Sequence, residues 1–206
     1  DKKYHQEVGM TPKQFVKKYV PEVAEKMYCI ANSNLDRTPY GKVYTQKLFN
    51  NAIDGDLWKW LNLPMEELKK YTLDILNADD HVLFGCDVLQ ETQTKLGYFH
   101  TGIFGMEDFF NQKFDGDRAW RLDYGQSFYT HCMIIAGVEM VDDKPVRWKV
   151  ENSWGTDVGK KGFYSMSDDW FDEHMIVVWV PEKYMKKEHL ELAGQEPVVL
   201  PPWFPI

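Results

Sequence analysis

The spacing of apolar residues predicts helices in the first part of the chain. Residues 11–14 (Thr-Pro-Lys-Gln) have the pattern of a capping box, and the apolar residues after them predict a short helix. A second helix is predicted from Pro64 to about Leu76, where apolar residues recur at helical spacing. Residues 32–41 are rich in Asn, Asp, Pro and Gly, and this composition predicts a loop between the two helices.

From residue 81 onward, short apolar runs separated by turns predict strands instead. The predicted strands cover residues 81–88, 128–140, 146–152, 162–166 and 175–180. Ser167 is predicted to cap a short helix. Residues 182–193 predict a last helix that ends at Gly194, and the proline-rich end of the chain predicts an extended tail. Residues 90–120 show no sustained periodicity and predict irregular structure with one helical turn.

These elements predict an α+β fold divided into three parts. A helical subdomain is expected at residues 1–80, and an antiparallel sheet domain at residues 81–180. A C-terminal helix and extended tail are expected at residues 181–206. The 206 residues are 44% hydrophobic and 15% aromatic, which is enough for one well-packed core.

Charge and composition narrow the classes of partner. The formal net charge is −8, so a broad basic surface for nucleic acid is not expected. We find no apolar run near 18 residues and no secretory signal segment, and therefore expect no membrane partner. Three widely spaced cysteines argue against a disulfide framework and favour a reducing cytoplasm. The histidines lack metal-ligand spacing, so the sequence predicts neither a metal site nor a cofactor.

The candidate chemistry lies on two of the predicted strands. Side chains alternate along a strand, so His131 is expected to share a face with Tyr129, Met133 and Ile135. A single histidine among apolar residues is more often a core residue than a catalytic one. Asn152 is expected to share a face with the preceding apolar residues of its own strand, and it could equally cap a turn.

His131 and Asn152 together indicate a catalytic pair more specifically than either residue does alone. A histidine can take a thiol proton, and an Asn oxygen can hold the other imidazole N–H and fix the tautomer. Residues 152–155 (Asn-Ser-Trp-Gly) follow the strand that carries His131, in the order this chemistry requires. Trp154 is expected to cover the contact between His131 and Asn152 and to exclude water from it.

The chain resembles the C-terminal half of the bleomycin hydrolase family of papain-like cysteine peptidases, which includes the bacterial aminopeptidase C. The matching segments are residues 10–15, 83–88, 130–133, 150–155, 161–163, 168–171, 195–197 and 200–203. The resemblance implies the right-hand, barrel-like domain of a papain-like peptidase with helical additions. It also implies that His131 is the catalytic base and Asn152 its orienter, and that the protein forms hexameric homo-oligomers.

The nucleophile that this pair would serve is missing from the chain. No Cys-Gly-Ser-Cys-Trp or similar segment precedes His131, so the N-terminal nucleophile half is expected to be a separate part of the same protein. Cys86 matches a family position that is not the nucleophile, Cys132 should point away from the face of His131, and Cys29 lies in no nucleophile context. We therefore expect the chain alone to be inactive.

The tail departs from the family pattern. The family's aminopeptidases end in a Trp-Asp-Pro-Met-Gly-Ala-Leu-Ala-like arm whose carboxylate binds the substrate's amino group, whereas residues 203–206 here are Trp-Phe-Pro-Ile. This difference favours an oligo-endopeptidase acting on peptides. The alternatives are a bleomycin hydrolase-like aminopeptidase, a catalytically inactive homologue or binding module, and a merely structural proteolytic fragment.

Overall fold

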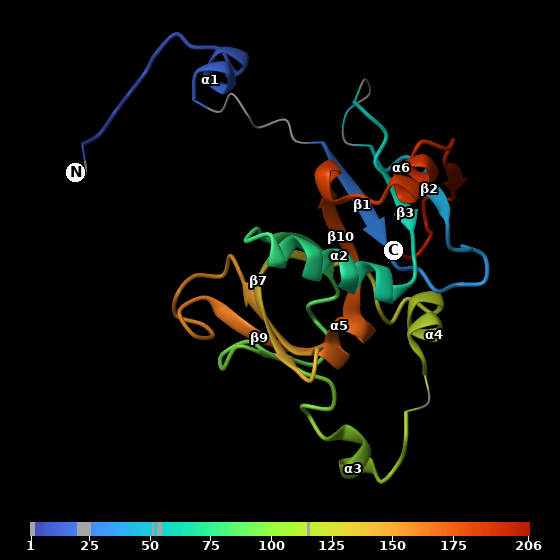
Figure 1. The fold of residues 1–206 in the computed structure, drawn as a ribbon. Helices are drawn as coiled ribbons and strands as arrows, with labels where there is room; N and C mark the ends of the chain where they lie inside the picture. Colours follow the sequence, from blue (N-terminus) through green and yellow to red (C-terminus); the bar gives the residue numbers. More distant parts are fainter. Residues whose placement is uncertain (1–2, 20–25, 51, 53–54, 115) are drawn as a thin grey trace.

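The computed structural model describes residues 3–19, 26–50, 52, 55–114 and 116–206 (Figure 1). Its helices are α1 (Pro12–Tyr19), α2 (Met65–Asn77), α3 (Met106–Phe110), α4 (Arg118–Asp123), α5 (Asp168–His174), the 3₁₀ helix η1 (Glu182–Tyr184) and α6 (Lys187–Ala193). Its strands are β1 (Met27–Ala31), β2 (Lys42–Gln46), β3 (Lys59–Asn62), β4 (Val82–Cys86), β5 (Thr92–Gln93), β6 (Tyr98–Phe99), β7 (His131–Val141), β8 (Lys144–Glu151), β9 (Phe163–Ser167), β10 (Met175–Pro181) and β11 (Val198–Leu200).

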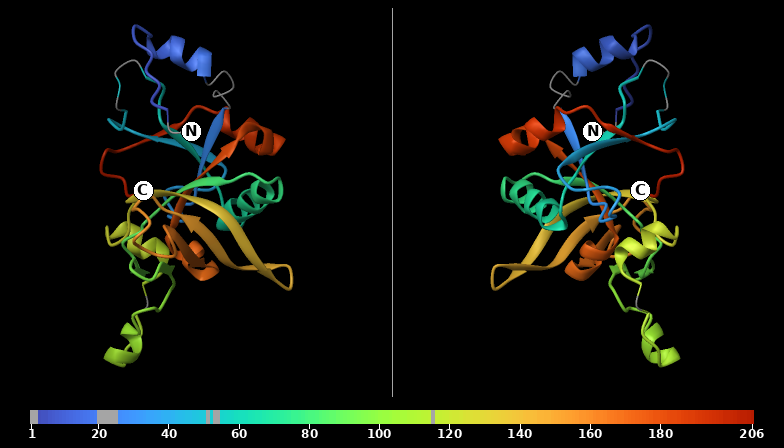
Figure 2. Two further views of the ribbon diagram at one scale, coloured as in Figure 1. Left: turned by 90° about the vertical axis from the view of Figure 1, so that its left-hand side faces the viewer. Right: turned by 90° about the vertical axis from the view of Figure 1, so that its right-hand side faces the viewer.

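The strands form one sheet in the order β11-β2-β3-β1-β10-β4-β7-β8-β9-β6-β5. Strands β10, β4, β7, β8 and β9 make an antiparallel run, whereas β1–β3, β11–β2 and β6–β9 are parallel pairs. The β7–β8 hairpin extends away from the rest of the sheet, as the side views show (Figure 2). The pairs β4–β7 and β7–β8 are the ones that place the candidate site.

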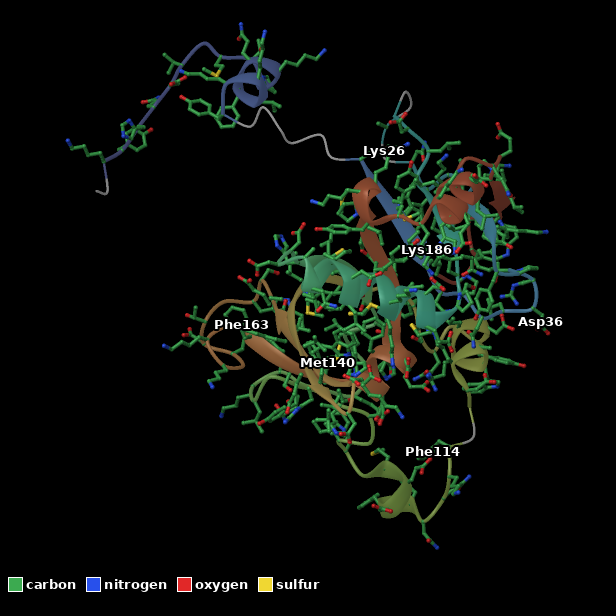
Figure 3. All side chains as sticks on the ribbon, in the orientation of Figure 1. Lys26, Asp36, Phe114, Met140, Phe163 and Lys186 are labelled. Atoms are coloured by element: carbon green, nitrogen blue, oxygen red, sulfur yellow. The ribbon has the colours of Figure 1, made fainter. Side chains whose placement is uncertain are left out.

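Two hydrophobic clusters lie on opposite faces of the strands. Neighbouring residues of β10 contribute to different clusters: Val178 belongs to the cluster that packs under α2, and Val177 belongs to the other. Helix α2 contributes Leu68, Tyr71 and Ile75, all fully buried, to the first cluster. The side chains are crowded between α2 and the strands behind it, and they are sparse around the α3 excursion where Phe114 lies (Figure 3).

Most predicted elements are confirmed. Helix α1 begins with the expected capping box, in which the Thr11 N–H donates to Gln14 Oε1 at 2.8 Å and the Gln14 N–H donates to Thr11 Oγ1 at 3.3 Å. Helix α2 and strands β4, β7, β8, β9 and β10 lie within one to three residues of their predicted bounds. Ser167 caps α5 by accepting from the Trp170 N–H at 3.2 Å.

The helical interpretation of residues 1–80 is wrong in one respect, because this part of the chain also contains β1, β2 and β3. These strands are only four or five residues long and are buried on both faces, so no apolar–polar alternation reveals them. The division of the chain into three domains stays a prediction. The last predicted helix is also interrupted, since η1 and α6 are separate elements, and the extended tail forms β11 beside β2.

Candidate active site

His131 is the first residue of β7, and it lies beside the end of β4. In the register of this antiparallel pair His131 is opposite Cys86. Met133 and Ile135, which follow on the same face of β7, are buried in the core under α2. The His131 side chain itself is only partly buried. The imidazole therefore lies where the core reaches the surface, and a reacting group from outside the chain can approach it.

The expectation that Tyr129 shares this face is wrong. Its hydroxyl oxygen lies 2.6 Å from Cys132 Sγ, and its ring occupies the space above Gly85, where a Cβ would lie 2.0 Å from a ring carbon. Gly85 pairs with Cys132 in the β4–β7 register, and Cys132 points away from the face of His131. Tyr129 precedes β7, so the alternation that fixes His131 and Met133 does not extend back to it.

Asn152 directly follows β8 and meets the imidazole there. Its Oδ1 lies 2.9 Å from His131 Nε2, and it also accepts the Ser153 N–H at 2.8 Å. The Asn152 backbone N–H donates to the Gly162 carbonyl at 3.1 Å, and this bond fixes the end of the strand. Asn152 is buried, so water competes weakly for the bond to His131.

This geometry assigns the tautomer of the histidine. The Ser153 N–H can only donate, so the Asn152 atom that it contacts is the oxygen. Nε2 of His131 lies 2.9 Å from the same oxygen, where two acceptors would repel each other, so Nε2 must carry a proton. Nδ1 of His131 forms no hydrogen bond to the residues that the structure describes. It is thus left available to exchange a proton with an external group.

Trp154 covers the imidazole. The two ring centroids are 5.0 Å apart with an interplanar angle of 25°, which is a stacked arrangement. The indole also makes a T-shaped contact with the Tyr164 ring, with the two ring centroids 6.2 Å apart. Trp154 thus shields one face of the imidazole, and its own side chain remains 40% exposed.

Tyr164 is a neighbour of the site that belongs to the Gly-Phe-Tyr run after the glycine-rich turn, but the sequence assigned it no role. It lies on β9 opposite Val150, and Asn152 follows Val150 by two residues, just past the end of β8. Burial raises the pKa of its phenol, while a contact with the Asn152 side chain acts in the opposite direction. No local sequence pattern marks a tyrosine two residues after a glycine turn as a site residue. Only the β8–β9 register brings Tyr164 close to Asn152.

The sequence profile of the Peptidase C1-like family matches residues 1–206. The chain belongs to this family. Among curated relatives, aminopeptidase C of Listeria innocua is 37% identical over 206 residues, an alignment that covers 100% of this chain and 47% of the relative. Bleomycin hydrolase of Gallus gallus is 37% identical over 212 residues, with 100% of this chain and 47% of the relative covered.

A solved structure supports the family's fold for this chain. The crystal structure of PepW from Lactobacillus rhamnosis is 39% identical with a TM-score of 0.91, over 96% of this chain and 45% of that one. The predicted α+β fold of a papain-like peptidase half is confirmed. The chain spans about half the length of the curated relatives it matches.

The cysteines of this Peptidase C1-like chain do not complete the site. Burial raises the pKa of the Cys29 thiol, and nearby Cys132 adds to the effect. Burial likewise raises the pKa of Cys86 well above its ordinary value, with Asp87 and Cys132 contributing. Thiols with raised pKa values are inert, because the thiolate is the reactive form. Cys132 is exposed, but it projects from the opposite face of β7 to His131.

Neither a metal-ligand cluster nor a membrane-spanning helix is present among the residues that the structure describes. Within those residue ranges, no group of three or more His, Cys, Asp or Glu side chains could hold a metal ion. None of the described helices combines the length and the apolar content needed to cross a bilayer.

Proposed function

We propose that this chain carries the base of a cysteine peptidase, with His131 as general base and acid, Asn152 as its orienter and Trp154 as its cover. The observation that supports this most strongly is the 2.9 Å contact between His131 Nε2 and Asn152 Oδ1, which leaves Nδ1 free on a partly exposed ring. The nucleophilic cysteine would come from the part of the protein outside this chain. That part and a peptide substrate are the partners the proposal requires.

The chemistry follows from the free nitrogen. Nδ1 takes the thiol proton of the external cysteine, giving a thiolate and an imidazolium whose Nε2–H is held by Asn152. The thiolate adds to the peptide carbonyl carbon. The Nδ1 proton then passes to the leaving amine as the C–N bond breaks and a thioester forms. Water, deprotonated by the now neutral imidazole, hydrolyses the thioester and restores the thiol.

The proposal is tested by removing the base from the full-length protein. In His131→Ala, peptide hydrolysis should fall by at least about 10³-fold, because the thiolate and the leaving-group proton are both lost. His81→Ala is the matched control, since the His81 side chain is 66% exposed and lies at the opposite end of β4. Equal activity of His131→Ala and His81→Ala would show that His131 is not the base.

Within this class we favour an oligo-endopeptidase. The support is residue 204, where a phenylalanine replaces the aspartate of the aminopeptidase arm. Phe204 is buried under the Arg37 guanidinium, and the Gln46 side-chain amide donates to its carbonyl at 3.2 Å. An aminopeptidase is the second candidate, because the relatives named above include aminopeptidase C. Internal cleavage of N-terminally blocked peptides supports the first candidate, and release of single N-terminal residues only supports the second.

A homo-oligomer in a reducing, cytoplasmic setting is part of the same proposal. The family resemblance supports the oligomer, and the free state of Cys29, Cys86 and Cys132 is compatible with a reducing compartment. Light scattering on the full-length protein measures the assembly directly, and a monomeric mass would refute it.

A further inference from the structure

Asp87 is a buried carboxylate that the chemistry above does not use. It directly follows β4 and is 1% exposed. Its two oxygens lie 3.3 Å from the Leu89 N, 3.4 Å from the Phe128 N and 3.4 Å from Thr130 Oγ1. Asp87 pairs with no cationic side chain among the residues that the structure describes. A buried charge without a counter-charge is costly, so these bonds to neutral donors must compensate for its lost hydration.

Thr130, the residue just before β7, joins the same network. Its backbone N–H donates to the Cys86 carbonyl at 3.0 Å, and its hydroxyl accepts the Val88 N–H at 2.9 Å. The hydroxyl proton has two acceptors within reach, the Cys86 carbonyl at 3.2 Å and the Asp87 carboxylate at 3.4 Å. Asp87 and Thr130 therefore hold the end of β4 against the segment that leads directly into His131.

The imidazole is held from two sides by different parts of the sheet. Asn152 and Trp154 contact the ring from the end of β8. They cannot fix the backbone from which the ring projects. That backbone begins β7 at its pairing with Cys86, and the residues before it are held through Asp87.

We propose that Asp87 is a positioning residue for His131, which acts by fixing residues 128–130 through hydrogen bonds to its buried carboxylate. This inference rests on the proposed function of His131. Asp87 has no contact with the imidazole in the described structure and takes no part in proton transfer. Its effect is to keep the start of β7 in place, so that Nδ1 faces the external thiol while Nε2 faces Asn152.

Removing the carboxylate should slow the reaction more than it weakens substrate binding. A displacement of about 1 Å at a catalytic group can cost about 10²-fold in rate. In the full-length protein, Asp87→Ala should therefore lower kcat by about 10²-fold and change KM by less than about threefold. Asp87→Asn should fall between the wild type and Asp87→Ala. All three partners of Asp87 can donate, and an amide retains only one accepting oxygen.

The matched control is Thr72→Val, which removes a fully buried hydroxyl that donates to the Leu68 carbonyl at 2.8 Å within α2. Kinetics are compared at temperatures where circular dichroism shows every variant folded. The ¹⁵N spectrum of His131 supplies a readout that general destabilisation does not move. In the wild type and Thr72→Val, His131 should give one set of ¹⁵N signals, with Nε2 protonated and bound to Asn152. Asp87→Asn and Asp87→Ala should show a second population that has lost this hydrogen bond.

The outcomes separate this inference from the function on which it rests. If His131→Ala keeps its activity, the proposed function itself is wrong. If His131→Ala is inactive but the Asp87 variants match Thr72→Val in kcat and in the His131 spectrum, only the role of Asp87 is refuted. A loss confined to KM would also refute it, because positioning of the base affects the chemical step.

Discussion

Truncation of Asn152 is the sharpest perturbation of the His131–Asn152 pair. Asn152→Ala removes the Oδ1 acceptor that lies 2.9 Å from Nε2, and the Trp154 stack covers the ring beside it. When His131 becomes an imidazolium, this bond is charge-assisted, and such bonds contribute about 1.5–3 kcal/mol. At about 1.4 kcal/mol per factor of ten, loss of the bond should lower kcat/KM by about 10- to 150-fold.

The assay is hydrolysis of a peptide aminomethylcoumarin by the full-length protein. Asn32→Ala serves as the control, because Asn32 is also buried and its amide also bonds within the fold, to the Leu63 carbonyl at 2.9 Å. That variant should lose stability but keep kcat/KM while it is folded. If Asn152→Ala and Asn32→Ala retain the same kcat/KM, the orienting role of Asn152 is refuted.

Three further predictions follow from the same structure. The 206-residue chain alone should hydrolyse no peptide. Cys29 and Cys86 are buried with raised pKa values, and Cys132 faces away from His131. Alkylator-sensitive turnover by the purified chain would contradict this prediction. Trp154→Ala should lower kcat/KM several-fold and Trp154→Phe less, because the ring at 5.0 Å shields the His131–Asn152 bond; equal rates in both variants would exclude a covering role. Burial lowers the pKa of His189 in the folded state. As the pH falls below about 6.5, His189 is therefore protonated in the unfolded state before it is protonated in the folded state, and this favours unfolding. The Tm should therefore fall between pH 7.5 and 5.5, and a His189→Gln variant with an unchanged pH slope would show that His189 is not the cause.

The sheet around the site was predictable because its strands are long and locally consistent. Strands β7 and β8 have 11 and 8 residues, and His131 and Asn152 stand at their ends beside a recognisable run of residues. The order of His131 and Asn152 in the sequence, together with Trp154, was enough to predict that the His131 and Asn152 side chains would lie in contact. Their distance was not predictable, because it depends on the β7–β8 register, which contains irregularities after Ile135 and after Glu139.

What sequence reasoning missed depends on contacts between distant segments. The four-residue strand β3 is buried on both faces and shows no periodicity, so only its pairing with β1 and β2 defines it. Tyr129 was assigned to the wrong face because a strand boundary decides where alternation starts. Asp87 follows an apolar run like many surface aspartates, and its burial results from the pairing of β4 with β7.

The central claim is that His131 supplies the charge that keeps an external cysteine ionised. The most direct measurement is the rate at which iodoacetamide alkylates the full-length protein at pH 6, where an isolated thiol is almost entirely protonated. The wild type should react rapidly with loss of peptidase activity, and His131→Ala should react at least about tenfold more slowly, because the thiolate–imidazolium pair is gone. Equal alkylation rates in the two proteins would contradict the account.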